Sequence, residues 1–83
     1  MKLFIANLAY SVRQIDLRAL FEPFGTVTEA SVARDKESGE SRGFGFVALS
    51  DPEDALRAID ELDQTEAYGR KLTVQESRAK VVR

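Results

Sequence analysis

The sequence contains no cysteine and no histidine. Without cysteine the chain has neither a disulfide framework nor a thiolate nucleophile, which fits a reducing compartment such as the cytoplasm. Without either residue type the usual zinc ligands are missing, so we expect no metal site. The composition therefore favours a cytoplasmic protein that works without a metal or another cofactor.

Long apolar segments are also missing. The sequence has no run of about 18 apolar residues, the length that a transmembrane helix needs. A strand-like pattern begins at Met1–Ile5, which leaves no room for a signal peptide. A chain of 83 residues is long enough for one small domain and too short for two. We therefore expect a single monomeric domain without a membrane partner.

Charge is unevenly distributed along the chain. The net charge is −2, yet residues 51–66 contain seven acidic residues and one arginine, a net −6, which leaves +4 on the rest. Such a run of acids is typical of a solvated helix face. Because the distribution of charge matters more than its sum for a nucleic-acid-binding protein, the negative total does not exclude an anionic partner.

Hydrophobic spacing predicts two helices. Apolar residues at helical spacing indicate a first helix that ends before Gly25, with Pro23 in its last turn. Ser50 or Asp51 is suited to cap a second helix, and Pro52 to its first turn. The residues expected to face the core are Leu17, Leu20, Phe21, Phe24, Ala55, Ala58, Ile59 and Leu62.

Strand-like segments surround these helices at residues 2–7, 27–32, 42–49 and 71–75. A polar loop at residues 35–41 separates the second strand from the third. The order is β-α-β-β-α-β, which predicts an α+β, ferredoxin-like fold. In that fold a four-stranded antiparallel sheet carries two helices on one face and leaves the other face open.

The segment Arg42–Leu49 is the most informative part of the sequence. Because side chains alternate along a strand, Phe44, Phe46 and Arg42 share one face. Both rings could pack beneath the helices, as aromatic residues usually do. Alternatively the glycines and aliphatic residues face the helices, since glycine permits close approach and a buried unpaired arginine is costly. Spacing alone leaves both arrangements open.

The same octamer resembles the signature K/R-G-F/Y-G/A-F-V-x-F/Y of the RNA recognition motif family, and it matches at seven of eight positions. A second signature of that family is similar to Leu3–Leu8, and further similarity runs through residues 16–25 and 69–74. The similarity covers about residues 2 to 77. The chain resembles the stand-alone, single-domain members found in bacteria, which are related to plant glycine-rich RNA-binding proteins but lack a glycine-rich tail. The similarity implies an RNA recognition motif domain at 1–77, followed by a basic tail at 78–83.

The resemblance implies a role for each matching residue. Phe4 and Phe46 would each stack beneath a base. Phe44 would pack against the sugars between those bases, and Arg42 would bind a phosphate. Gln75 and Ser77 would read base edges, while Lys2 and Lys71 would add positive charge at the border. Asn7 also matches, but asparagine readily bonds backbone, so we expect it to hold the turn after the first strand.

Three positions depart from the family pattern. Leu49 replaces an aromatic residue, but it points toward the core, so we expect an effect on packing. Arg13 stands where the first helix usually has a Ser or Thr cap, and it is a poor N-cap. Ile15 would be an exposed apolar residue, which makes it a candidate contact for a partner or for a second copy.

An enzyme and a protein-interaction module are the competing functions. Catalysis needs an anion cradle with a nucleophile or an activated water, and no acid pair clusters near a glycine-rich turn. Gly43-Phe44-Gly45 is not a phosphate loop, because bulky rings inside a strand exclude that geometry. A protein-interaction module would use the same aromatic face. We therefore expect a non-catalytic domain that binds single-stranded RNA, with single-stranded DNA as a second candidate and no small-molecule substrate.

Overall fold

The computed structural model describes residues 1–77, in which six strands and two α-helices follow the predicted order with one addition. The elements are β1 (Lys2–Ala6), α1 (Gln14–Phe21), the 3₁₀ helix η1 (Glu22–Phe24), β2 (Val27–Arg34), β3 (Ser41–Leu49), α2 (Pro52–Leu62), β4 (Glu66–Ala67), β5 (Arg70–Lys71) and β6 (Thr73–Glu76). Within this part of the chain, no helix has the length and apolar character needed to cross a membrane. The basic tail predicted at 78–83 lies outside the described residues.

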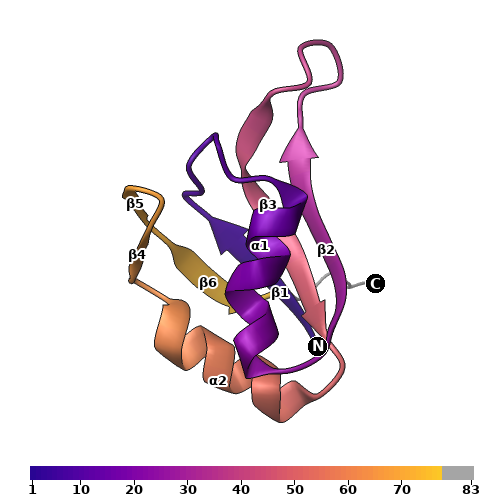
Figure 1. Ribbon diagram of the computed structural model, residues 1–83, viewed down its shortest axis with the longest axis vertical. Helices are drawn as coiled ribbons and strands as arrows, with labels where there is room; N and C mark the ends of the chain where they lie inside the picture. Colours follow the sequence, from indigo (N-terminus) through magenta and orange to yellow (C-terminus); the bar gives the residue numbers. More distant parts are fainter. Residues whose placement is uncertain (78–83) are drawn as a thin grey trace.

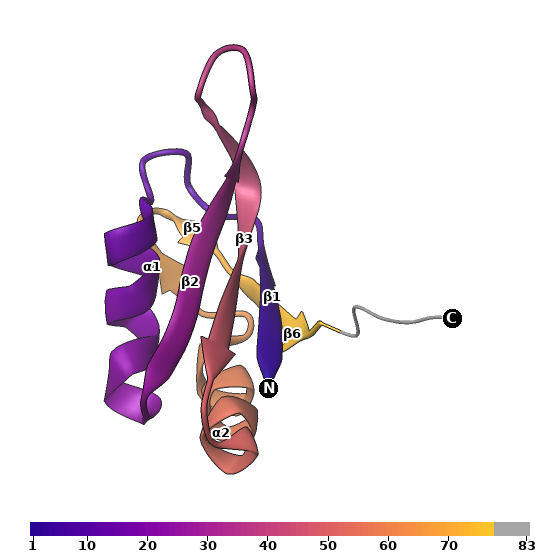
Figure 2. The ribbon, with the colours of Figure 1, turned by 90° about the vertical axis from the view of Figure 1, so that its right-hand side faces the viewer.

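The main sheet has the strand order β2-β3-β1-β6, and every pair in it is antiparallel. The two central strands are therefore β3 and β1, the strands that carry the two family signatures. Figure 1 shows the sheet behind α1, and Figure 2 shows both helices on the same side of it. The predicted ferredoxin-like α+β fold is confirmed, and neither helix of residues 1–77 lies over the other face of the sheet.

At the start of each helix a carboxylate accepts a hydrogen bond from a free backbone N–H. Asp51 caps α2, because its carboxylate accepts a hydrogen bond from the backbone N–H of Glu53 at 2.9 Å. Arg13 precedes α1 without a side-chain cap, as predicted. Instead the Asp16 carboxylate accepts from the backbone N–H of Arg13 at 3.0 Å, which is half of a capping box.

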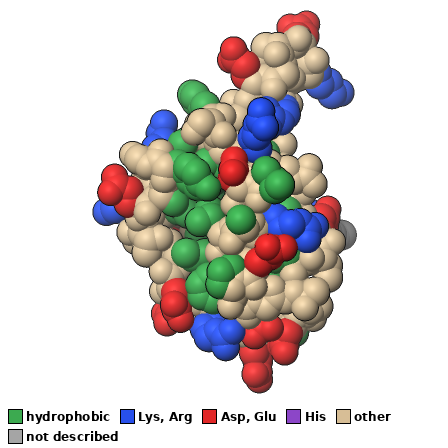
Figure 3. Space-filling model, in the orientation of Figure 1, with side chains coloured by type: hydrophobic (Ala, Val, Ile, Leu, Met, Phe, Trp, Pro, Cys, Tyr) green, Lys and Arg blue, Asp and Glu red, His purple; other side chains and the backbone are tan. Residues whose placement is uncertain are grey.

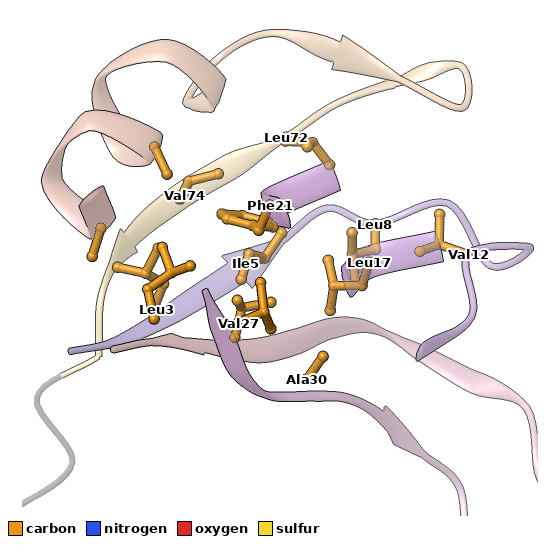
Figure 4. Packing of buried hydrophobic residues seen from close by; sticks show 14 of the residues in the cluster. Leu3, Ile5, Leu8, Val12, Leu17, Phe21, Val27, Ala30, Leu72 and Val74 are labelled. Carbon is orange, nitrogen blue, oxygen red and sulfur yellow. The ribbon is translucent and has the colours of Figure 1, made fainter. Parts of the chain in front are cut away.

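The core lies between the sheet and the helices and is entirely apolar within the described residues. Leu3 and Ile5 of β1 meet Leu17 and Phe21 of α1, and each of these four side chains is 0% exposed (Figure 4). Leu49 is also buried, as its predicted inward position requires. Burying this set is the main favourable contribution to folding, at roughly 1.5–3 kcal/mol for each large side chain.

Two predicted elements differ in detail. The first helix was expected to remain regular as far as Phe24, but α-helical geometry ends at Phe21 and continues as η1, where Pro23 cannot donate a backbone hydrogen bond. The last strand was expected to include Lys71. That residue instead lies in β5, which pairs with β4 in a separate two-stranded sheet. Leu72 separates this hairpin from β6.

Candidate nucleic-acid interface

Three phenylalanine rings lie together on the open face of the sheet. Phe4 of β1 pairs with Phe46 of β3, and Phe44 pairs with Ala6 on the same face. Their buried neighbours along the strands, among them Leu3 and Val47, point to the opposite face. The alternation therefore resolves the arrangement that spacing had left open: the rings face away from the helices.

The three rings contact one another. The ring centroids of Phe4 and Phe46 are 5.5 Å apart, those of Phe4 and Phe44 are 5.7 Å apart, and those of Phe44 and Phe46 are 6.3 Å apart. Each ring is partly exposed, because it is covered by its neighbours and open on its outer side. The rings form a continuous aromatic surface, called the platform below, that suits stacking of unpaired bases.

Gly45 lies between Phe44 and Phe46 and explains why their rings point outward. A Cβ atom at Gly45 would overlap the backbone oxygen of Ser31 and lie 3.1 Å from Cδ2 of Leu17. The inner face of β3 has no space for a side chain here, because α1 and β2 approach the strand closely. A large residue can therefore be placed at 44 or 46 only on the open face.

Arg42 provides a cation at one border of the platform. Its guanidinium carbon lies 6.0 Å from the centroid of the Phe44 ring, at the limit of a cation–π contact. Arg42 is exposed and forms no ion pair with any described residue. Gly43 follows it with a φ of 85°, a conformation that favours glycine. This arginine is free to bind a phosphate next to the rings.

Lys2 lies at the opposite end of the platform, where an acid accompanies it. Its Nζ atom is 5.1 Å from the centroid of the Phe46 ring and 3.9 Å from Oε1 of Glu29. Sequence reasoning did not single out Glu29. Its neighbour Ala30 is buried, so strand alternation could have placed Glu29 on the open face. The acid partly neutralises one of the predicted RNA-binding cations.

Gln75 and Ser77 lie beside β1. Gln75 is exposed and is the register partner of Phe4, so its side chain emerges next to that ring. The backbone N–H of Ser77 donates to the backbone oxygen of Lys2 at 2.9 Å, which holds the end of the described chain against the sheet. Gln75 therefore borders the platform, and Ser77 lies beside Lys2 directly after β6.

Lys71 lies beyond the end of the main sheet, in the β4–β5 hairpin. Asn7 ties this hairpin to the end of β1: its amide nitrogen donates to the backbone oxygen of Lys71 at 2.6 Å, and its amide oxygen accepts from Arg70 at 2.7 Å. Asn7 also has a φ of 61°, which asparagine adopts more readily than most residues. Asn7 therefore has the expected structural role, but its partners, Arg70 and Lys71, are 63 and 64 positions away in the sequence.

The β2–β3 loop is ordered by one carboxylate. Asp35 accepts backbone hydrogen bonds from Glu37 at 2.8 Å and from Ser38 at 3.0 Å. The backbone hydrogen bond from Ser38, followed by that from Glu37, lowers the pKa of Asp35 below its usual 3.8. Since the carboxylate is ionised at neutral pH, the loop that leads to Arg42 keeps this turn under physiological conditions.

The described residues contain no group of three or more His, Cys, Asp or Glu side chains arranged to hold a metal. What they contain is an uncovered antiparallel sheet with a cluster of three rings, a free arginine at one end and a paired lysine at the other. Such a surface is chemically suited to stacking unpaired bases and to neutralising a nucleic-acid backbone at its border. These features define a sheet-based binding domain for single-stranded nucleic acid.

The family can be stated from sequence as well. The family model of the RNA recognition motif matches residues 3–73. The chain belongs to the RNA recognition motif family, and the domain is accordingly an RNA-binding module rather than an enzyme.

Similar proteins include the "Polyadenylate-binding protein, cytoplasmic and nuclear" of Eremothecium gossypii, which is 48% identical over 98% of this chain and 14% of its own length. The "Glycine-rich RNA-binding protein 4, mitochondrial" of Arabidopsis thaliana is 45% identical over 88% of this chain and 54% of its own length. The chain thus spans between about a seventh and about half of these two relatives.

Solved structures agree with the fold. The crystal structure of RNA Binding Protein PG1 has a TM-score of 0.93 and 48% identity, and the match covers 99% of each chain. A structure described as a Sxl-lethal protein/RNA complex has a TM-score of 0.90 and 28% identity over 96% of this chain and 48% of that one. A protein of this fold has therefore been seen with RNA bound.

Proposed function

We propose that the domain, residues 1–77, binds single-stranded RNA across the platform, with bases stacked on Phe4 and Phe46. The observation that carries this proposal is the group of three mutually contacting rings on the uncovered face of the sheet. In this assignment Phe44 contacts the sugars between the two bases and Arg42 binds a phosphate. The face has room for about two to four nucleotides, and one chain is the binding unit.

Residues at the border contribute charge and polar groups. Lys2 and Lys71 attract the RNA backbone from the two ends of β1, while Gln75 and Ser77 offer hydrogen bonds to base edges next to Phe4. The acids of α2 lie on the helix side, where they repel RNA and so favour its approach to the platform. The cysteine-free composition fits a role in the cytoplasm.

A titration with three labelled probes tests this function. We expect micromolar binding to a random-sequence single-stranded RNA and at least about tenfold weaker binding to the same RNA in a duplex, because paired bases are not free to stack. Single-stranded DNA should bind within about tenfold of RNA, since stacking does not sense the 2′-hydroxyl. Equal affinity for the duplex would contradict stacking. No binding to any probe would favour a protein partner on the same face.

We expect a shallow dependence of RNA affinity on salt. Among residues 1–77 the candidate phosphate contacts of the platform are Lys2, Arg42 and Lys71, so we expect a slope of log K against log salt of about −2 or shallower. Titrations of the same RNA from low to high salt measure this slope. A slope near −5 or steeper would show that phosphate contacts, and not stacking, supply most of the affinity.

Removing the charge of Glu29 should strengthen RNA binding. In Glu29→Gln the ammonium of Lys2 loses its partner at 3.9 Å and becomes available to phosphate, so we expect affinity to rise about two- to fivefold at low salt. Glu53→Gln is the matched control, because it makes the same charge change on the helix side. An equal gain in both variants would mean that net charge alone is responsible.

A further inference from the structure

A groove of about 470 Å³ lies on the helix side, where the start of α1 meets the end of β2. It is lined by Arg13, Gln14, Ile15, Arg18 and Arg34. None of the three arginines forms an ion pair with another described residue. Ile15 is 70% exposed at the same place. The groove therefore combines unpaired positive charge with an apolar contact.

Two of the arginines are held in position by backbone. The guanidinium of Arg18 donates to the oxygen of Val27 at 3.1 Å, and that of Arg34 donates to the oxygen of Gly39 at 3.1 Å. The nearby Asp16 is occupied as the acceptor of the N–H at the start of α1. These arginines are held in place but carry unneutralised charge, and Ile15 lies beside them. A complementary surface would therefore present acidic side chains on either side of an apolar one.

The exposed face of α2 has this pattern. Glu53, Leu56 and Asp60 are spaced by three and four positions, so they form one stripe along the helix. Leu56 is 54% exposed, and neither acid forms an ion pair within the described chain. The buried residues of α2, Ala55 and Ala58, lie on its other side. The stripe therefore offers an apolar side chain between two free carboxylates.

The groove and the stripe lie at different ends of the molecule. In Figure 3 acidic side chains gather at the end that α2 forms, with Lys or Arg beside them, and the end that the β2–β3 loop forms carries both acidic and basic side chains. Two different surfaces that fit one another on identical copies make a head-to-tail contact that repeats. We propose that copies of this chain associate in this way, with the stripe of α2 in the groove of the next copy.

The apolar residues favour a second copy over RNA in the groove. A phosphate gains nothing from Ile15, whereas Leu56 provides an apolar partner for it and the two acids provide partners for the arginines. Both surfaces are on the helix side, so association leaves every platform open. The inference goes beyond the proposed function, for which one chain is sufficient.

Sedimentation of the full chain tests the association. At low salt we expect the weight-average mass to rise with concentration from the 9.3 kDa of one chain to at least about twice that value near 1 mM. The increase should disappear at about 0.5 M salt, because exposed charges are then screened. A constant mass of one chain at low salt and every concentration would overturn the proposal.

Two variants distinguish the two surfaces. The groove variant is Arg13→Glu/Ile15→Gln, and the stripe variant is Leu56→Gln/Asp60→Lys. Each should remain a single chain alone, whereas their equimolar mixture should form dimers and stop, because one intact stripe meets one intact groove. Lys36→Glu and Glu37→Lys make the same charge changes in the exposed β2–β3 loop and should leave association unchanged.

Unfolding temperatures of all variants should stay close to that of the original protein, since the substitutions are at exposed positions. If both double variants still associate, or if the mixture does not, the proposed contact is wrong. If the groove variant weakens RNA binding by more than about threefold, the arginines contact RNA instead, which also overturns the proposal. An unchanged RNA affinity together with lost association supports it.

Discussion

Replacing both central rings, as in Phe4→Ala/Phe46→Ala, is expected to abolish most of the RNA affinity. Stacking contributes about 1–3 kcal/mol per base, so losing two stacked bases should weaken binding by at least about 30-fold. The loss follows from geometry: the two rings are adjacent, 5.5 Å apart, and open to solvent on their outer side. Fluorescence anisotropy with a short single-stranded RNA measures the change.

Two controls separate stacking from stability. The rings also pack against each other, so we expect the double variant to lose about 1–2 kcal/mol of stability and to remain folded at room temperature. Leu56→Ala removes an exposed apolar side chain from the helix side and should leave RNA affinity unchanged. Affinity that survives in the folded double variant would exclude the platform as the RNA site.

The largest loss of stability is expected from Gly45→Ala. The added methyl group would overlap the backbone oxygen of Ser31 and press against Leu17, and backbone cannot move away as a flexible side chain can. Overpacking of this kind costs about 1–3 kcal/mol or more, which lowers the melting temperature of a domain of this size by roughly 10–20 °C. Thermal unfolding followed by circular dichroism measures the shift.

Gly39→Asn is the matched control for this substitution. Like Gly45, Gly39 has no side chain, but a Cβ atom added at Gly39 would meet nothing within 4 Å. Its φ of 78° is one that asparagine tolerates. The control should melt within a few degrees of the original protein. A similarly small effect of Gly45→Ala would show that β3 can move away from α1. In that case the packing that directs Phe44 and Phe46 outward is softer than the structure indicates.

The order of elements was predictable because it depends on local patterns. The caps and the apolar spacing of α2 determine its start and its buried face, and both agree with the structure. The outward direction of Phe44 and Phe46 needed more than spacing. It depends on the close approach of β2 and α1 to Gly45, a contact that only the assembled fold reveals.

The details that sequence reasoning missed are one short hairpin and several contacts between distant segments. The β4–β5 hairpin has two residues in each strand, which is too short for an alternating pattern, and Tyr68 adopts a positive φ that its residue type does not suggest. The ion pair of Glu29 with Lys2 joins strands that are not adjacent in the sheet. Asn7 was recognised as structural, but its bond to Lys71 could not be inferred from nearby sequence.

The central position of β1 makes the platform depend on contacts between residues that are far apart in the sequence. Phe4 is the register partner of Phe46 and of Gln75, which are 42 and 71 positions away along the chain. Contacts of such sequence separation close slowly, because the entropy of long loops must be lost before the pairing stabilises anything. A nascent or truncated chain without β6 therefore lacks part of the RNA surface. RNA that binds only the complete sheet stabilises the whole domain by mass action, so the ligand also protects the domain from unfolding.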